Sequence, residues 1–232
     1  MKKKLGIIGG MGPMASQLFY KMVTEHTKAE KDQDHLEIVL LSDSAMPDRT
    51  GAILSGEYDE VRKKLAEDAE ILSKTGCGCI AVTCNTAHFF VDMVKDESAI
   101  PFIHMIRETS KEMASKFPGG KIGIMATDGT IKTKLYQNIL SEYGLEPFTP
   151  SEDVQKLVMH EIYDCIKAGL RYDEDAFGKI EMEFRNAGCD SVLLACTELS
   201  VIKSDESLDD WYVDPMLVLA KRAIEFCGGE YI

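Results

Sequence analysis

Short continuous apolar runs alternate along the chain with stretches of helical periodicity. Each run is apolar throughout rather than at every second position, which is typical of parallel strands covered on both faces. The pattern therefore predicts six buried strands. They are LGIIG (5–9), EIVLLS (37–42), CIAVT (79–83), IPFIH (100–104), KIGIMA (121–126) and SVLLA (191–195).

The stretches between these runs carry helix signals. In residues 59–76, apolar side chains recur every three or four positions and Gly76 follows the last turn. Residues 151–169 show the same spacing between Ser151, a good N-cap, and Gly169. This alternation of strands and helices predicts an α/β fold whose mainly parallel sheets are flanked by helices.

A weak internal repeat runs through the chain. The segment TGCGCIAVTCNTA (75–87) aligns with AGCDSVLLACTEL (187–199), so that Cys84 meets Cys196 at the tip of each apolar run. The segment KLGIIGGMG aligns with KIGIMATDG at nearly the same spacing. Each half therefore has two matching strands that end in turns.

The repeat predicts two pseudo-twofold-related lobes, each a mainly parallel sheet flanked by helices. We expect residues 1–105 plus 210–232 to form the first lobe and residues 106–209 the second. Ligands of open parallel sheets bind beyond the carboxyl ends of the strands. The active site is therefore expected in a cleft between the lobes, where the two thiols would meet.

Composition narrows the class of function. The 232 residues are 45% hydrophobic, and no apolar run approaches the roughly 20 residues that span a bilayer. The formal charge of -13 disfavours nucleic acids and anionic membranes as partners. Seven cysteines without an export signal indicate reduced thiols and a cytoplasmic location.

The sequence motifs for metal binding and for dinucleotide binding are incomplete. Cys77 and Cys79 are spaced CxC, but no second Cys or His pair follows at zinc-finger spacing, so no metal is expected. The first turn, GGMGPMA, matches a dinucleotide fingerprint in its letters, but Pro13 interrupts the pattern. A turn whose backbone amides face a small anion is the better interpretation.

Cys84 allows two interpretations. A free cysteine is usually a buried and inert residue, and taken alone Cys84 fits that description. However, it ends a strand and is expected to open a helix, and a helix N-terminus favours the thiolate. Cys196 has the same setting at the matching repeat position. We therefore interpret these two as a reactive pair and the other five cysteines as core residues.

Two opposed thiols suit a reaction that inverts a carbon centre. A thiolate removes a proton from one face of the carbon and a thiol delivers one to the other face. The carbanion formed between these steps needs hydrogen bonds in a cleft that excludes water. The candidates to hold the α-carboxylate of the substrate, all at strand tips, are Asn85, Thr86, Thr127 and Thr197.

Two cations could hold an anionic substrate. Arg49 lies in a loop after the second strand, where it could equally be solvated or paired with Asp48. Lys167 closes a helix, where a cation also complements the helix dipole. The residues alone leave both alternatives open.

The motifs GIIGGMGP, PDRT, TCNTAH and ACTEL together resemble the cofactor-independent aspartate/glutamate racemase family, and more closely its aspartate racemase branch. The resemblance implies two α/β lobes, a catalytic cysteine from each lobe, no cofactor and a homodimer. By matching motifs it implies an acid/base pair, Cys84 and Cys196. It also implies a substrate-binding set, which comprises Met11, Gly12, Arg49, Asn85, Thr86, Lys167, Thr197 and Glu198.

The motifs also depart from those of the glutamate racemases. Glu198 stands where those enzymes have a histidine, and the first turn lacks their acidic residue. We therefore expect a racemase that acts on aspartate, with glutamate as a second substrate to be considered. The alternative is a two-cysteine isomerase of another small diacid such as maleate. A small-anion-binding or redox-sensing protein is the non-enzymatic alternative.

Overall fold

Two parallel four-stranded sheets organise the chain in a computed structural model that describes residues 2–232. The strands of the first sheet are β1 (Lys4–Gly9), β2 (Ile38–Ser42), β3 (Cys77–Val82) and β4 (Phe102–Ile103). Those of the second are β5 (Lys121–Ala126), β6 (Glu146–Phe148), β7 (Ser191–Ala195) and β8 (Tyr212–Val213). The strand orders are β2-β1-β3-β4 and β6-β5-β7-β8, so the second sheet repeats the topology of the first.

Every strand pairing within these sheets is parallel, and the register confirms the predicted fold class. In parallel sheets, all carboxyl ends point to one edge. Cys84 follows β3 and Cys196 follows β7, so each thiol lies at the carboxyl edge of its own sheet and at the same place in the strand order.

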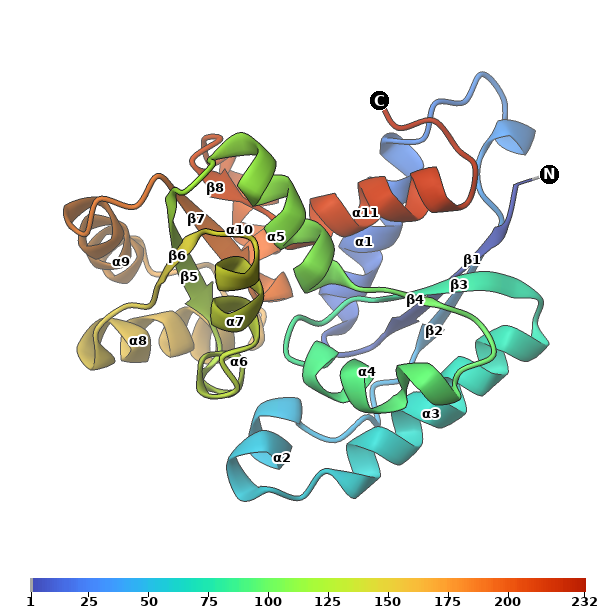
Figure 1. Ribbon diagram of the computed structural model, residues 1–232, viewed down its shortest axis with the longest axis horizontal. Coiled ribbons are helices and arrows are strands. Elements are labelled where there is room, and N and C mark those ends of the chain that lie inside the picture. The colour runs from blue at the N-terminus through green and yellow to red at the C-terminus, as the bar shows by residue number, and fades with distance from the viewer. Residues whose placement is uncertain (1) are drawn as a thin grey trace. The chain divides into compact units, whose positions relative to one another are not determined.

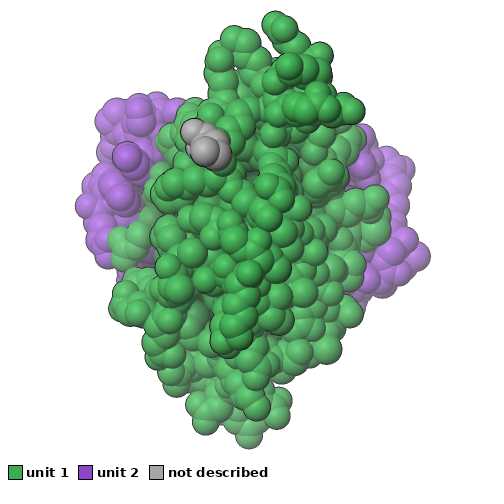
Figure 2. Space-filling model, turned by 90° about the vertical axis from the view of Figure 1, so that its right-hand side faces the viewer, with its two compact units in different colours: residues 1–108, 216–232 green, residues 109–215 purple. Residues whose placement is uncertain are grey.

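The chain forms two compact units, which Figure 2 colours separately. Residues 1–108 and 216–232 form the first unit, and residues 109–215 form the second. The chain changes unit at 108/109 and 215/216, rather than at the expected 105/106 and 209/210. Strand β8 pairs with β7, which keeps this segment with the second sheet.

Helices cover both faces of the first sheet (Figure 1). On one face, Ile8 and Ile80 pack against α3 (Asp59–Lys74) and α4 (His88–Val94). On the other face, Leu5 and Ile7 pack against α1 (Pro13–Glu25) and α11 (Pro215–Phe226). Continuous apolar strands are needed because both faces are buried. The unit also contains α2 (Arg49–Ser55) and the short 3-10 helices η1 (Asp32–Asp34) and η2 (Lys95–Glu97).

The second unit has its own core. Met125 of β5 and Val192 of β7 pack with Val158, Ile180 and other apolar side chains. The helices of this unit are α6 (Asp128–Lys132), α7 (Leu135–Glu142), α8 (Glu152–Met159), the π-helix η3 (His160–Ile166), α9 (Glu174–Asn186) and α10 (Thr197–Glu206). Helix α5 (Met105–Lys116) contains the boundary between the units. Within residues 2–232, no helix combines the length and apolar character needed to cross a bilayer.

Candidate active site

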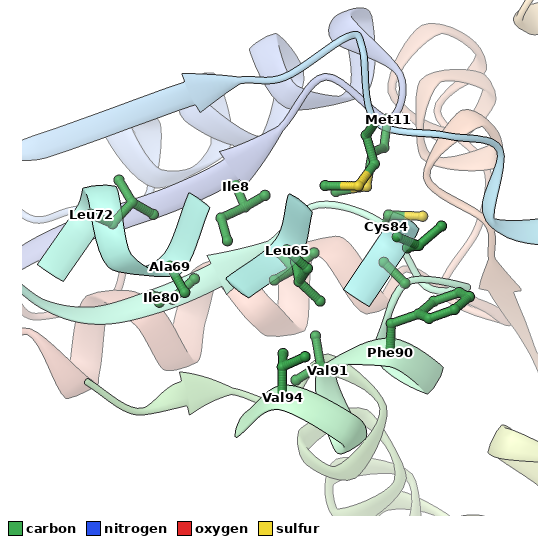
Figure 3. Close-up of a cluster of buried hydrophobic side chains, with 14 of the residues drawn as sticks. Ile8, Met11, Leu65, Ala69, Leu72, Ile80, Cys84, Phe90, Val91 and Val94 are labelled. Carbon is green, nitrogen blue, oxygen red and sulfur yellow. The ribbon is translucent and has the colours of Figure 1, made fainter. Parts of the chain in front are cut away.

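Cys84 lies in the bend between β3 and α4 and is only 7% exposed. It belongs to an apolar cluster with Met11, and Figure 3 shows the two side chains at the same end of that cluster. Residues 85–87 form a turn, and α4 begins at His88. The expectation that Cys84 itself opens the helix is therefore wrong, because one turn separates them.

The backbone of Cys84 is held by a histidine. The Nδ1 atom of His88 donates to the Cys84 carbonyl at 2.9 Å, and its Nε2 accepts from the backbone N–H of Met105 at 3.1 Å. Burial, and to a smaller extent the nearby His104, lowers the pKa of His88 to about 3. His88 is therefore neutral and occupied at both ring nitrogens.

The first turn is tied to the strand end that carries Cys84. Ser16 Oγ accepts from the Gly10 N–H and donates to the Gly12 carbonyl, both at 2.9 Å. The same oxygen lies 3.0 Å from Thr83 Oγ1, next to Cys84 in the chain. The Gly10 N–H, one of the amides expected to face a small anion, therefore donates to a side chain of the protein. Sequence reasoning missed Ser16 and Thr83, because a small hydroxyl residue in a strand or helix carries no distinctive pattern.

Arg49 is the first residue of α2 and is 9% exposed, so it is not a solvated loop residue. Its guanidinium donates to the backbone carbonyls of Met11 at 2.9 Å and Pro47 at 3.0 Å. The side chain thereby connects the turn after β1 with the loop after β2. A buried guanidinium at the carboxyl edge of the sheet provides positive charge close to Met11.

Asn85 and Thr86 lie in the turn that follows Cys84, and both are buried. Both therefore lie next to the thiol, and their role in substrate binding stays a prediction. Gly12 caps the N-terminus of α1 in extended conformation. In the first unit, the predicted set thus gathers around the ends of β1, β2 and β3.

Cys196 is the N-cap residue of α10 and is 6% exposed. Its thiol donates to Glu198 Oε2 at 2.9 Å, and Lys167 Nζ donates to Glu198 Oε1 at 2.5 Å. Burial raises the pKa of the Cys196 thiol well above its usual range, the Glu198 carboxylate raises it further, and Lys167 acts in the opposite direction. The expected thiolate at this helix N-terminus is therefore not favoured, and Cys196 is a protonated thiol.

Lys167 directly follows the π-helix η3, and its N–H donates to the carbonyl of Ile162, five residues earlier, at 3.0 Å. Sequence reasoning placed its ammonium on the substrate. The structure places it on the carboxylate that accepts from Cys196. Lys167 thus reaches Glu198 from the end of a π-helix, a helix type that is frequent at functional sites.

The two threonines predicted as substrate-binding residues in the second unit, Thr127 and Thr197, are buried at strand ends. Thr127 follows β5 and caps α6, where its Oγ1 accepts from the N–H of Thr130 at 3.3 Å. Thr197 begins α10, and its hydroxyl donates to Glu198 Oε2 at 3.4 Å. The second half of the predicted set thus gathers around the ends of β5 and β7.

The geometry can be set beside known proteins. The family model for Asp/Glu/Hydantoin racemase matches residues 8–223. The chain belongs to this family. The match confirms the resemblance and identifies the chain as a racemase, and therefore as an isomerase.

Two proteins illustrate the similarity of this racemase to its relatives. The broad specificity amino-acid racemase RacX of Bacillus subtilis is 26% identical over 225 residues, which cover 95% of this chain and 96% of the relative. The structure of Picrophilus torridus aspartate racemase is 30% identical, with a TM-score of 0.80 over 99% of this chain and 96% of that one.

A third relative shows the fold alone. The structure of a putative Asp/Glu racemase from Yersinia pestis has a TM-score of 0.81 at 24% identity and covers 97% of this chain and 99% of that one. In the racemase described here, residues 2–232 contain no cluster of three or more His, Cys, Asp or Glu side chains suited to a metal ion.

Proposed function

We propose that this racemase interconverts L- and D-aspartate without a cofactor, with glutamate as a second substrate. Cys84 and Cys196 exchange protons with the substrate Cα from opposite faces. Family membership supports an amino-acid substrate, and the similarity to an aspartate racemase supports aspartate. The equivalent positions of the two thiols in sheets of the same topology support the paired role.

The contact between Cys196, Glu198 and Lys167 carries the proposal. A thiol that donates to a carboxylate at 2.9 Å is held protonated and oriented, as a proton donor must be. The ammonium of Lys167 pairs with the other oxygen of the same carboxylate. A buried cysteine with only a packing role has no need of this ion pair.

The reaction starts with Cys84 as thiolate and Cys196 as thiol. Cys84 removes the Cα proton from one enantiomer and becomes a thiol, which leaves the electron pair on the substrate carbon. Cys196 then delivers its proton to the opposite face and becomes a thiolate. The product is the other enantiomer, and the reverse reaction exchanges the two roles.

Glu198 has a role in the second half of this cycle. After Cys196 has given up its proton, the thiolate lies beside Glu198. The positive charge of Lys167, which pairs with Glu198, stabilises this thiolate. When Cys196 regains a proton from the Cα of the opposite enantiomer in the reverse reaction, the carboxylate again accepts a hydrogen bond from the thiol and orients it. We therefore assign Glu198 and Lys167 to Cys196, rather than to the substrate carboxylates alone.

The remaining polar groups would bind the substrate. Arg49 provides the positive charge for the side-chain carboxylate in the first unit, where it is buried near Met11. Asn85, Thr86 and Thr197 would hold the α-carboxylate and the amine. Thr127, at the end of β5, would contribute a hydroxyl. Aspartate and glutamate differ by one methylene, which changes binding by only about 1–3 kcal/mol, so both belong in the assay.

Chiral chromatography of reactions with L-aspartate, L-glutamate and L-alanine tests this function. We expect the highest turnover with aspartate, and a loss of about 10²- to 10⁴-fold in Cys84→Ala and Cys196→Ala, the usual contribution of an acid/base group. The buried Cys77 and Cys189 provide matched controls, one in each unit. If Cys77→Ala and Cys189→Ala lose as much as the first pair, the thiol mechanism is wrong. Conversion of maleate without any D-amino acid would replace the racemase proposal with the isomerase alternative.

The homodimer and the cytoplasmic location are further parts of the proposal. The homodimer rests on the resemblance to the aspartate racemases, and the location rests on the reduced cysteines. Sedimentation or light scattering of the purified chain measures the first directly.

A further inference from the structure

We propose that His88 is a positioning residue that fixes Cys84 through its backbone carbonyl. The inference rests on the catalytic role proposed for Cys84. It concerns a residue that neither binds the substrate nor transfers a proton, because both of its ring nitrogens are engaged with the backbone.

The side chain of His88 supplies a bond that the backbone leaves unmade. In a regular helix, the N–H of residue 88 would donate to the carbonyl of residue 84. Here the N–H of His88 donates to Asn85 at 3.0 Å, because residues 85–87 form a turn. The Nδ1 atom of the same residue binds the Cys84 carbonyl instead, at 2.9 Å.

The second ring nitrogen extends this support to another element. The N–H of Met105 is the first of α5, and the first N–H groups of a helix have no acceptor within it. His88 Nε2 accepts from this N–H at 3.1 Å. The two bonds require one tautomer, with a proton on Nδ1 and none on Nε2, so the ring joins the Cys84 bend to the start of α5.

The surroundings keep the ring neutral. His88 is fully buried, and its ring centroid lies 4.9 Å from that of His104. Asp92 of α4 faces this pair, with its Oδ2 3.5 Å from His104 Nε2, and its Oδ1 accepts from Lys95 Nζ at 2.6 Å. The backbone N–H of Arg107 donates to His104 Nδ1 at 3.3 Å. A proton on His88 Nε2 would remove the acceptor for Met105 and place charge in the core.

Cys84 is therefore held on both sides. Thr83 precedes it and lies 3.0 Å from Ser16, and His88 holds its carbonyl. In the absence of the second contact, the bend could rotate and carry the thiol away from the substrate carbon. Misplacement of a reacting group by about 1 Å can cost about 10²-fold in rate.

Two substitutions separate the two bonds. In His88→Asn the amide nitrogen takes the place of Nδ1 and keeps the bond to Cys84, whereas in His88→Gln the amide group reaches the place of Nε2 and keeps the bond to Met105. Both lose the ring and one of the two contacts. We expect kcat to fall at most about threefold in His88→Asn and at least about tenfold in His88→Gln, with KM for aspartate within about twofold in both.

Alkylation gives a readout that a packing defect would not produce. Iodoacetamide labelling, followed by peptide mass, should show a changed rate at Cys84 in His88→Gln, with Cys196 as internal reference. Equal losses of kcat in both variants, in step with equal losses of thermal stability, would overturn the positioning role. Full activity of Cys84→Ala would overturn the proposed function, and the His88 inference with it. If Cys84→Ala is inactive but the two His88 variants lose equal amounts of kcat and of thermal stability, only the His88 inference is overturned.

The unmodified protein provides a test that does not depend on variant folding. Long-range ¹⁵N–¹H NMR spectra of the histidine rings report the tautomer directly. We expect a ring that keeps its proton on Nδ1 from pH 5 to pH 8. Observation of the Nε2–H tautomer for His88, or of its titration in this range, would contradict the assignment.

Discussion

The two thiols occupy equivalent strand ends but have different surroundings. Cys84 is backed by the neutral His88, whereas Cys196 contacts the Glu198–Lys167 pair. A helix N-terminus stabilises a nearby anion by only about 0.3–1 kcal/mol. Removal of a charge from water costs several kcal/mol, which is why burial dominates at Cys196 despite its N-cap position.

Arg49 allows a test of substrate charge at the residue scale. We expect Arg49→Ala to lower kcat/KM for aspartate roughly 30- to 5,000-fold. This factor corresponds to about 2–5 kcal/mol, the usual cost of removing one partner of a buried charge pair. Arg49→Lys should fall between this variant and the native enzyme, because it keeps the charge but loses the planar fork. Lys63, on the exposed surface of α3, is the control cation. Unchanged aspartate kinetics in Arg49→Ala would remove Arg49 from the site.

Asp68 allows a test of pH-dependent stability. Burial raises its pKa to about 6, with Asp43 adding to the shift, and its Oδ2 has no hydrogen-bond partner. Because the folded state binds this proton more tightly than the unfolded state, the stabilisation is present at low pH and is lost as pH rises through about 6. At pH 7.5 the ionised carboxylate therefore destabilises the fold.

We expect Asp68→Asn to raise the free energy of unfolding by about 1–3 kcal/mol at pH 7.5 and by much less at pH 4.5, as measured by urea denaturation. His88 also makes stability depend on pH, but in the opposite direction, because its pKa is lowered in the folded state. Comparison of the variant with the native protein at the same pH cancels this contribution. The neighbour of Asp68, Glu67, is more than half exposed and makes the smallest contribution to the shift of Asp68, so Glu67→Gln should change both values much less than Asp68→Asn does. A gain that is equal at both pH values would contradict the burial argument.

At the element scale, the sequence pattern predicted β1 to β5 and β7, with the short β4 inside the run 100–104, and missed β6 and β8. The runs around β1, β2, β3, β5 and β7 agree with the structure within one or two residues, because buried parallel strands are apolar throughout. Strands β6 and β8 contain three and two residues, too few to show a period. The helix expected over 151–169 is α8 followed by the π-helix η3, so the helical segment was predicted but its change of helix type was not.

The turn after β1 illustrates a constraint between elements. Gly10 has φ of +88°, and a Cβ atom there would lie 2.4 Å from the backbone of Asp43, just after β2. Gly76, in the same unit, has φ of +81° with nothing within 4 Å of its Cβ position. The two glycines thus share the same left-handed conformation, but only Gly10 also lies close to the backbone of another element, at Asp43.

This difference predicts unequal costs for the same substitution. We expect Gly76→Ala to cost about 1–2 kcal/mol of stability, the usual penalty for left-handed backbone. Gly10→Ala should cost at least about 3 kcal/mol, because backbone atoms must also move. Thermal or urea unfolding measures both values. Equal costs would show that the close approach of the turn to Asp43 is not a constraint.

For the whole molecule, the sequence repeat corresponds to two sheets with the same strand order, each with one thiol beyond its third strand in chain order. Aligned cysteines were sufficient to find this pair. The contacts around them could not be found in the same way. Glu198 contacts Lys167, which is 31 residues away in the chain, and Ser16 and His88 bind backbone atoms that only the fold brings together.

Incubation with L-aspartate in D₂O tests the central claim most directly, with ¹H NMR and chiral chromatography on the same samples. The Cys84→Ala/Cys196→Ala double variant, purified in parallel, controls for a contaminating racemase. We predict that the native enzyme, without added cofactor, replaces the Cα hydrogen with deuterium as D-aspartate accumulates toward equal amounts, and that the double variant does neither. The absence of both Cα deuterium and D-aspartate with the native enzyme would contradict the account.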